Sequence, residues 1–192
     1  MVQRWWLPRV SRSLPPVLNL PNLFTLARLA LVPFILWAIL SRRHAAAAAL
    51  FVAAAVTDSL DGALARGFGR TTRAGAYLDP MADKVLLSGV FLGLAAIGSI
   101  PVWFVALVFG RDLAILAGAA VLLKLTKFRS FSPSRWGKAS TFAQIATAAL
   151  CMSRNALAAP ALAAAADLAL WPAAILTLVS GIDYAARAAR LQ

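Results

Sequence analysis

The 192-residue chain has few acidic residues and no glutamate. Its seven acidic side chains are all aspartates, against 19 lysines and arginines, which gives a formal net charge of +12. The single cysteine, Cys151, excludes an internal disulfide, and with one histidine, His44, the chain cannot form a Cys/His zinc cluster. We interpret Cys151 as a packing residue and His44 as a solvated loop residue. The aspartates are therefore the main candidates for a chemical site.

Long polar stretches are also missing, which excludes a separate soluble domain. Hydrophobic residues make up 61% of the chain, and the mean hydropathy is +0.78. Soluble domains contain roughly 45–50% apolar residues, so this excess predicts a membrane protein. The positive charge then fits an anionic lipid surface, and we expect no nucleic-acid partner.

Six apolar segments are spaced along the chain, at about 23–40, 45–60, 85–100, 102–123, 141–157 and 162–184. A helix needs roughly 17–25 residues to cross about 30 Å of hydrocarbon. The second and third segments are short unless their helices extend into the polar stretch between them. Ala and Leu predominate without the two-residue alternation of a barrel strand, and small residues allow close helix packing. The pattern predicts an all-α polytopic protein with six transmembrane helices.

Basic residues divide unevenly between the two sides of this topology. With a cytoplasmic N-terminus, thirteen lysines and arginines lie inside and three outside, namely Arg42, Arg43 and Arg154. This positive-inside bias predicts that both termini and residues 61–83 are cytoplasmic. We expect residues 1–18, with Trp5 and Trp6, to lie on the membrane surface. A disordered tail is the alternative, and residues 19–192 form the six-helix domain.

Four of the seven aspartates fall between positions 58 and 83. Asp58 and Asp61 are three residues apart and Asp79 and Asp83 are four apart, so each pair shares one face of a helix. Two successive helices joined by a short cytoplasmic loop can bring both pairs together. Four neighbouring carboxylates need a compensating cation, and oxygen ligands favour hard ions such as Mg²⁺, Mn²⁺ or Ca²⁺. The set suffices for two ions, an arrangement suited to displacement at phosphorus and to a pyrophosphate substrate.

Residues next to the aspartates also fit a nucleotide. Gly62 and Gly75 leave room for a close ligand, although helix packing explains either glycine equally well. Arg66 can complement a phosphate, or it can be an ordinary charge on the inside of the membrane.

The segment reads D-x2-D-G-x2-A-R-x8-G-x3-D-x3-D. Its fixed positions are Asp58, Asp61, Gly62, Ala65, Arg66, Gly75, Asp79 and Asp83. This pattern resembles the signature of the CDP-alcohol phosphatidyltransferase family at every fixed position and spacing. The resemblance covers nearly the whole chain. It implies six helices with a site at the cytoplasmic face, in a homodimer.

By this resemblance, the enzyme transfers the phosphatidyl group of CDP-diacylglycerol to an alcohol and releases CMP. Asp58, Asp61 and Asp79 would hold two Mg²⁺ or Mn²⁺ ions, with Asp83 completing the set. Asp83 would also be the general base for the acceptor hydroxyl. The nucleotide would contact Asn22, Arg28, Gly62, Ala65, Arg66 and Gly75.

The acceptor follows from a finer resemblance. The NLPNLFTLARLALVP stretch and the DPMADK run are similar to phosphatidylglycerophosphate synthases and to CDP-lipid-dependent cardiolipin synthases. Arg111, Lys138 and Gln144 match a later part of the pattern. Arg28 and Arg111 are charges inside apolar helices, where a charge is usually functional, although snorkelling toward a headgroup is the alternative. We expect Arg111, Arg135 and Lys138 to bind a phosphate-containing acceptor.

Glycerol 3-phosphate is the acceptor that we favour, which predicts a phosphatidylglycerophosphate synthase of the cell inner membrane. Asp112 departs from this reading, because many such synthases have glutamate there. Arg-Asp is more similar to the cardiolipin synthases, which use phosphatidylglycerol. A divalent-cation transporter and a structural membrane protein are more distant alternatives.

Overall fold

The computed structural model describes the backbone of residues 20–68, 73–125 and 134–189, and the side chains of residues 25–57, 81–118 and 134–187. Within these ranges the chain forms six helices and no strand. The helices are α1 (Leu20–Leu40), α2 (His44–Phe68), α3 (Arg73–Ala96), α4 (Val102–Leu125), α5 (Arg135–Leu157) and α6 (Pro160–Ala189). The predicted all-α fold is confirmed. The predicted surface segment, residues 1–18, lies outside the described residues.

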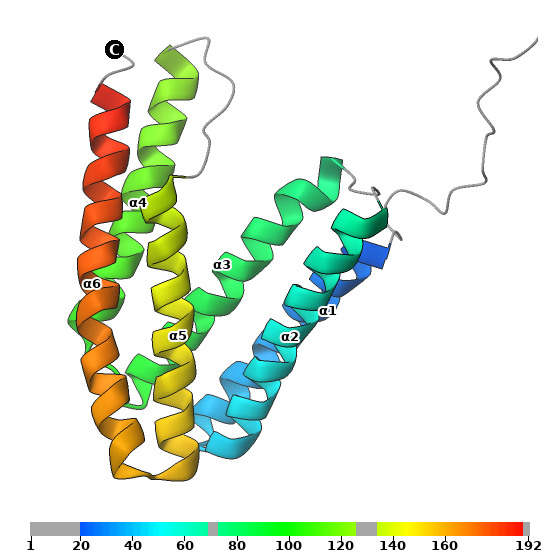
Figure 1. Cartoon of the computed structure of the whole chain (residues 1–192), viewed down its shortest axis with the longest axis vertical. Coiled ribbons are helices and arrows are strands. Elements are labelled where there is room, and N and C mark those ends of the chain that lie inside the picture. Colours follow the sequence, from blue (N-terminus) through cyan, green and yellow to red (C-terminus); the bar gives the residue numbers. More distant parts are fainter. Residues whose placement is uncertain (1–19, 69–72, 126–133, 190–192) are drawn as a thin grey trace, which may run out of the picture.

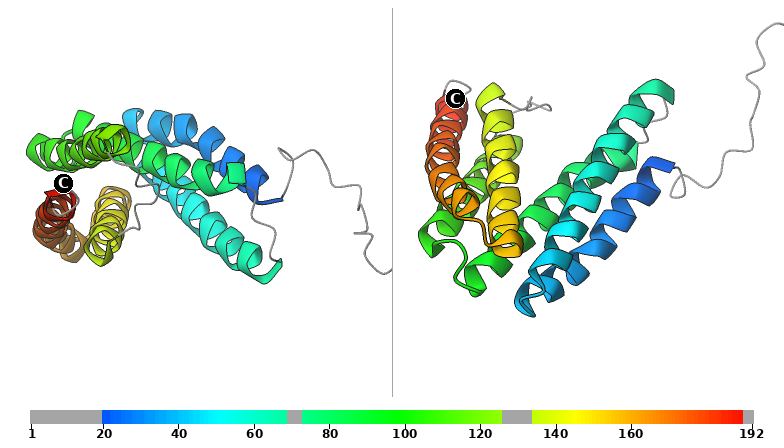
Figure 2. Two further views of the ribbon diagram at one scale, coloured as in Figure 1. Left: turned by 90° about the horizontal axis from the view of Figure 1, so that it is seen from above. Right: turned by 60° about the horizontal axis from the view of Figure 1, so that its bottom comes forward.

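The helices form two layers of three, as Figure 2 shows from above. One layer contains α1, α3 and α4, and the other contains α2, α5 and α6. Within the layers, α3 packs against α1 and α4, while α5 packs against α2 and α6. Between them, α1 contacts α2, α3 contacts α5, and α4 contacts α6.

Successive helices run in opposite directions (Figure 1). At the upper end of Figure 1, α1, α3 and α5 begin and α2, α4 and α6 end. The three short turns between α1 and α2, α3 and α4, and α5 and α6 lie at the lower end. The end of α2 and the first half of α3, on which the four aspartates lie, are therefore toward the upper end, where α1 begins and α6 ends.

Most helix boundaries agree with the sequence pattern. As predicted, α2 and α3 extend into the polar stretch, to Phe68 and from Arg73. The third helix was expected to reach Ile100 but ends at Ala96, because Gly98 adopts a φ of 73° that leaves the helix. The fifth helix begins earlier than the predicted position 141, because Ser134 caps it by accepting a hydrogen bond from the Gly137 amide.

The core lies where α1, α3 and α4 meet the second layer. Phe91 of α3 and Phe104 of α4 are fully buried, with ring centroids 5.5 Å apart in an edge-to-face contact. Gly93 brings α3 close to α1, since a Cβ at this position would lie 3.2 Å from Ile39 Cγ2. Cys151 is buried in the same core, which confirms its interpretation as a packing residue.

A polar cluster at the lower end joins α5 and α6 to the turn after α3. Arg154 of α5 donates hydrogen bonds to the carbonyl oxygen and, at 2.9 Å, to the hydroxyl of Ser99, in the turn after α3. Arg154 also forms an ion pair with Asp167 of α6 at 2.7 Å. Asn155 contacts the same Ser99 hydroxyl at 2.8 Å. We call these four residues the lower-end cluster.

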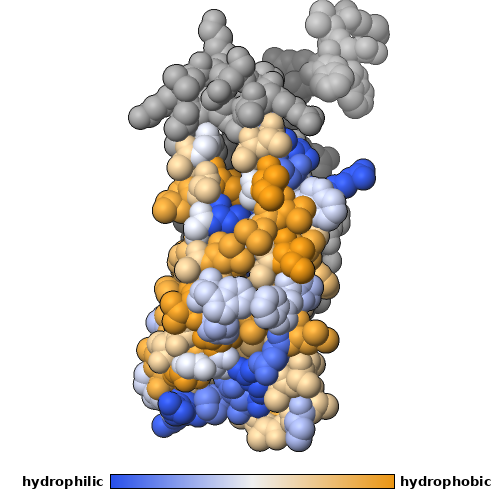
Figure 3. All heavy atoms as spheres, turned by 90° about the vertical axis from the view of Figure 1, so that its left-hand side faces the viewer, coloured by the Kyte–Doolittle hydropathy of each residue, from blue (hydrophilic) through white to orange (hydrophobic). Residues whose placement is uncertain are grey.

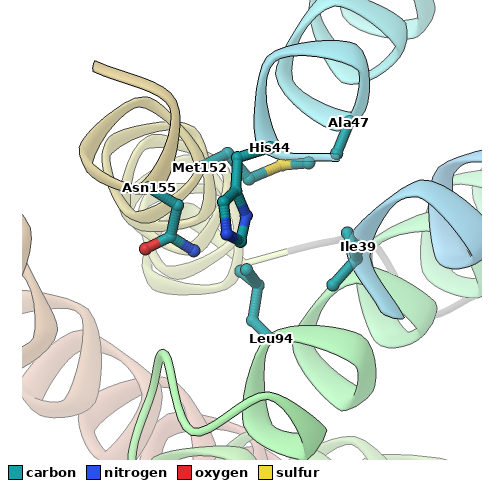
Figure 4. Close-up of a pocket in the computed structure, with 6 residues that line it drawn as sticks. All are labelled: Ile39, His44, Ala47, Leu94, Met152 and Asn155. Carbon is teal, nitrogen blue, oxygen red and sulfur yellow. The ribbon is translucent and has the colours of Figure 1, made fainter. Parts of the chain in front are cut away.

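His44 is not a loop residue, so the sequence-based interpretation was wrong. It is the first residue of α2, and its side chain is only partly exposed. Its ring points into a small pocket toward Asn155 and Leu94 (Figure 4). Helix α2 begins directly after the turn that contains Arg42, whose φ is 55°, and this turn directs His44 inward.

The outer surface of the helices is largely apolar. Figure 3 shows one side, on which hydrophobic side chains predominate and a group of hydrophilic ones lies at the lower end. Large exposed side chains there and elsewhere include Leu113 of α4, Phe142 of α5 and Ile175 of α6. Among the described side chains, one helix, Pro160–Arg187, is long and apolar enough to cross a membrane. The apolar stretches Thr25–Leu40 and His44–Thr57 are shorter.

Candidate active site

An ion pair joins α1 to α3 in the upper half of the bundle. Arg28 lies in the apolar helix α1, and its side chain is only 2% exposed. A buried guanidinium needs a charged or hydrogen-bonding partner, because losing its hydration costs several kcal/mol. Arg28 Nη1 donates to Asp83 Oδ1 at 2.5 Å. The Asp83 side chain is half-exposed, so the carboxylate that is anchored to α1 also reaches the surface of the described part of the chain.

The next residue of α3 makes a second ion pair on a different helix. Adjacent residues of a helix point about 100° apart, so Asp83 and Lys84 face different neighbours. Lys84 Nζ donates to Asp112 Oδ2 of α4. The other Asp112 oxygen accepts from Arg111 Nη1 at 2.7 Å.

Arg111 extends this network to α6. Its Nη2 donates to Ser180 Oγ at 2.5 Å, and its guanidinium carbon lies 5.7 Å from the centre of the Tyr184 ring. The second distance is within the range of a cation–π contact. The two α6 residues are four apart and so share one helix face. Two groups of polar contacts thus extend across α1, α3, α4 and α6: the Arg28–Asp83 pair, and the network that joins Lys84, Asp112 and Arg111 to the Ser180 hydroxyl. We call these six residues the charged row.

Tyr184 also connects the charged row to the start of α5. Its hydroxyl accepts a hydrogen bond from the Ser134 amide at 3.2 Å. Gly137 allows this contact, since a Cβ there would lie 3.2 Å from the Tyr184 oxygen. The first turn of α5 contains no acidic residue and carries Arg135 and Lys138. Their side chains are exposed, and neither has an ion-pair partner among the described residues.

Several predicted site residues lie outside the described side chains. Asp58, Asp61, Gly62, Ala65 and Arg66 are on α2, Asp79 and Gly75 on α3, and Asn22 on α1. Their helical backbone confirms the segments on which the spacing argument depends. Among the described side chains, no group of three or more His, Cys, Asp or Glu residues can hold a metal ion. That four aspartates converge on two metals therefore stays a prediction.

Sequence reasoning missed three members of this arrangement. Lys84 belonged to the DPMADK run but was assigned no role, and neither Ser180 nor Tyr184 was considered. The sequence contained a signal for Ser180 and Tyr184, because these two polar residues interrupt an apolar helix and are four positions apart. Polar groups facing one way in such a helix commonly face other helices.

The family comparison agrees with the motif. The sequence profile of the CDP-alcohol phosphatidyltransferase family matches residues 18–179. The chain belongs to this family and is therefore a transferase of the CDP-alcohol phosphatidyltransferase type.

Individual relatives have more specific names. A Mycobacterium tuberculosis protein provisionally named a phosphatidylglycerophosphate synthase is 38% identical over 181 residues, which are 91% of this chain and 83% of its own. The Bacillus subtilis CDP-diacylglycerol–glycerol-3-phosphate 3-phosphatidyltransferase is 34% identical over 86% of this chain and 93% of its own. A Mycobacterium bovis protein provisionally named a cardiolipin synthase is 35% identical over 66% of this chain and 60% of its own.

Proposed function

We propose that this enzyme is a phosphatidylglycerophosphate synthase, which transfers the phosphatidyl group of CDP-diacylglycerol to glycerol 3-phosphate. The main support for this proposal is that relatives named for this activity align over most of their own length and most of the length of this chain. The relative named for cardiolipin synthesis aligns over a smaller share of both. Family membership alone supports only the general reaction, so the acceptor is the point to test.

In the proposed reaction, Asp83 accepts the proton of the acceptor hydroxyl as its oxygen bonds to the β-phosphorus. The bond from that phosphorus to the bridging oxygen breaks, and CMP leaves. Asp83 suits this role because Arg28 fixes one of its oxygens while half of the side chain stays open. Arg28 is buried beside the proposed base, a position from which it can also bind a substrate phosphate.

We propose Asp58, Asp61, Asp79 and Asp83 as ligands for two Mg²⁺ or Mn²⁺ ions. Carboxylate oxygens are the donors that such hard ions prefer, and the described Asp83 carboxylate fits this chemistry. Bound ions would neutralise charge on the pyrophosphate and on the leaving CMP. Nucleotide contacts from Asn22, Gly62, Ala65, Arg66 and Gly75 complete the CDP site in this proposal.

We assign acceptor binding to Arg111, Arg135 and Lys138. Tyr184 supports grouping them, since it contacts the Arg111 guanidinium and the backbone where α5 begins. Arg135 and Lys138 are exposed in the first turn of α5, where the helix dipole also attracts anions. A phosphate monoester such as glycerol 3-phosphate carries the charge that these groups attract.

We propose that all six helices span the cell inner membrane with the site facing the cytoplasm. The helices contain 21–30 residues, so even the shortest is about 31 Å long. The exposed apolar side chains of α4, α5 and α6 suit contact with lipid. The ends that carry most of the basic residues lie together at the upper end, in agreement with the positive-inside bias. A homodimer is a further expectation from the family resemblance.

The deciding experiment measures CMP release from CDP-diacylglycerol by the purified enzyme with Mg²⁺ or Mn²⁺. Glycerol 3-phosphate and phosphatidylglycerol are offered in parallel. Release with glycerol 3-phosphate alone supports our proposal, and release with phosphatidylglycerol alone makes the enzyme a cardiolipin synthase. Asp112 favours the second outcome, because Arg-Asp resembles the cardiolipin synthases at this position. Release with neither acceptor, from folded protein, contradicts both assignments.

A further inference from the structure

Asp112 of α4 binds one cation with each carboxylate oxygen, and one of the two bonds joins α4 to α3. Oδ2 accepts from Lys84 of α3, the residue next to the proposed base, and Oδ1 accepts from Arg111 of α4. Among the described residues, the Lys84–Asp112 ion pair and the Phe91–Phe104 ring contact both connect α3 to α4. The Asp112 side chain is 22% exposed, which shields these ion pairs partly from solvent.

The Arg111 guanidinium is held on both sides. Neighbouring helix residues do not normally face each other, so the bond from Arg111 to Asp112 requires the long arginine side chain to bend toward the next residue of α4. The Ser180 hydroxyl of α6 accepts a hydrogen bond from the second terminal nitrogen of Arg111. The Arg111 side chain is 9% exposed. Each terminal nitrogen carries two N–H groups and makes one bond within the described part of the chain, so in this inference the second N–H of each donates to an anion.

From this geometry we infer that Asp112 and Ser180 are positioning residues that fix the Arg111 guanidinium for the phosphate of the acceptor. The inference rests on the proposed acceptor site. An arginine held in one orientation loses less conformational freedom when it binds a phosphate than a mobile one. Through its bond to Lys84, Asp112 also fixes α4, which carries Arg111, relative to α3, which carries Asp83. This contact then sets the distance between the bound acceptor hydroxyl and the Asp83 carboxylate.

A charge effect and a positioning effect of Asp112 predict opposite results. If the carboxylate only reduced the positive potential, Asp112→Asn would strengthen binding of an anionic acceptor. If it positions Arg111, the same substitution weakens that binding, since a neutral amide cannot hold both cations with charged hydrogen bonds. We expect Asp112→Asn to raise KM for the acceptor at least tenfold and KM for CDP-diacylglycerol less than twofold. Asp112→Glu, which keeps the charge, should recover part of the loss.

Asp183 provides a matched control. It is an aspartate of similar exposure, 23%, that also forms an ion pair with an arginine, Arg187, four residues later on α6. Asp183→Asn should leave both KM values within twofold of wild type. Ser180→Ala removes the other bond to Arg111 without changing any charge. It should raise the acceptor KM about threefold or more, and it keeps the inference testable if Asp112→Asn does not fold.

A double-mutant cycle tests whether Asp112 acts through Arg111. In an Arg111→Ala background, Asp112→Asn should change the acceptor KM less than twofold. Additive effects would overturn the inference, as would a lower acceptor KM in Asp112→Asn. The KM for the acceptor and the KM for CDP-diacylglycerol are both measured with whichever acceptor the wild-type enzyme uses. Wild-type turnover with phosphatidylglycerol alone would therefore correct the proposed function, while the cycle would still decide the role of Asp112.

Discussion

Removing the donors of Arg154 should destabilise the protein without impairing its chemistry. Arg154 is 19% exposed and joins α5 to the turn after α3 and to α6. Arg154→Met keeps much of the aliphatic stem and deletes the two bonds to Ser99 and the ion pair with Asp167. A hydrogen bond to a charged group contributes about 1.5–3 kcal/mol, and the two bonds to Ser99 share one nitrogen, so together they contribute about 2–3 kcal/mol. The pair with Asp167, which is 68% exposed, adds at most about 1 kcal/mol.

A loss of about 2–4 kcal/mol corresponds to a decrease in melting temperature of roughly 5–15 °C for a chain of this size. Thermal unfolding in detergent measures the decrease, with Asp167→Asn as the control that removes only the exposed pair. We expect the control to lower the melting temperature by less than about 4 °C. Both KM values should be unchanged in Arg154→Met, because none of these Arg154 contacts is to a residue of the charged row. If Arg154→Met and Asp167→Asn lower the melting temperature equally, the bonds to Ser99 do not supply most of the stabilisation by Arg154, and the prediction is refuted.

Three further predictions concern the site and the backbone. Asp83→Asn should abolish turnover while CDP-diacylglycerol still binds, and near-normal CMP release would remove Asp83 from the role of base. Gly98→Ala should lower the free energy of unfolding by about 1–2 kcal/mol, because alanine disfavours a φ of 73°. Gly110→Ala, inside α4, should be neutral or stabilising in the same unfolding assay, because no side chain or neighbouring helix among the described residues lies within 4 Å of the new Cβ. Chelation with EDTA should stop CMP release, and added Mg²⁺ or Mn²⁺ should restore it; activity that persists without divalent ions would contradict the metal assignment.

Helix number and extent could be predicted from the sequence because they depend on local properties. The length of each apolar segment and the need to lengthen α2 and α3 followed from residue rise and membrane thickness. The ends of α3 and α5 were misplaced because single residues decide them. At Gly98 a positive φ ends the helical geometry, and at Ser134 a side-chain hydrogen bond starts the next helix before the apolar segment begins.

Pairing between helices could not be predicted in the same way. The spacing of the aspartates identified a candidate site, but the partner of each one depends on tertiary packing. In the described residues, α2 and α3 both pack on α1 rather than on each other, although they are consecutive in the chain. This arrangement places Arg28 of α1 against Asp83, and no local pattern in either segment encodes that contact.

The distribution of polar residues also separates a transferase from a cation transporter. A transported ion needs successive oxygen ligands across the membrane. Between the charged row and the lower-end cluster, the described core of α1, α3 and α4 is instead apolar, with Ile35, Val90, Phe91 and Phe104 buried. Dehydrating a divalent ion in such a layer is prohibitive. An enzyme that receives a water-soluble acceptor at one face and leaves its lipid substrate in the bilayer needs no such path. The buried polar side chains of α5 and α6, Ser140, Gln144 and Thr177, hydrogen-bond to one another.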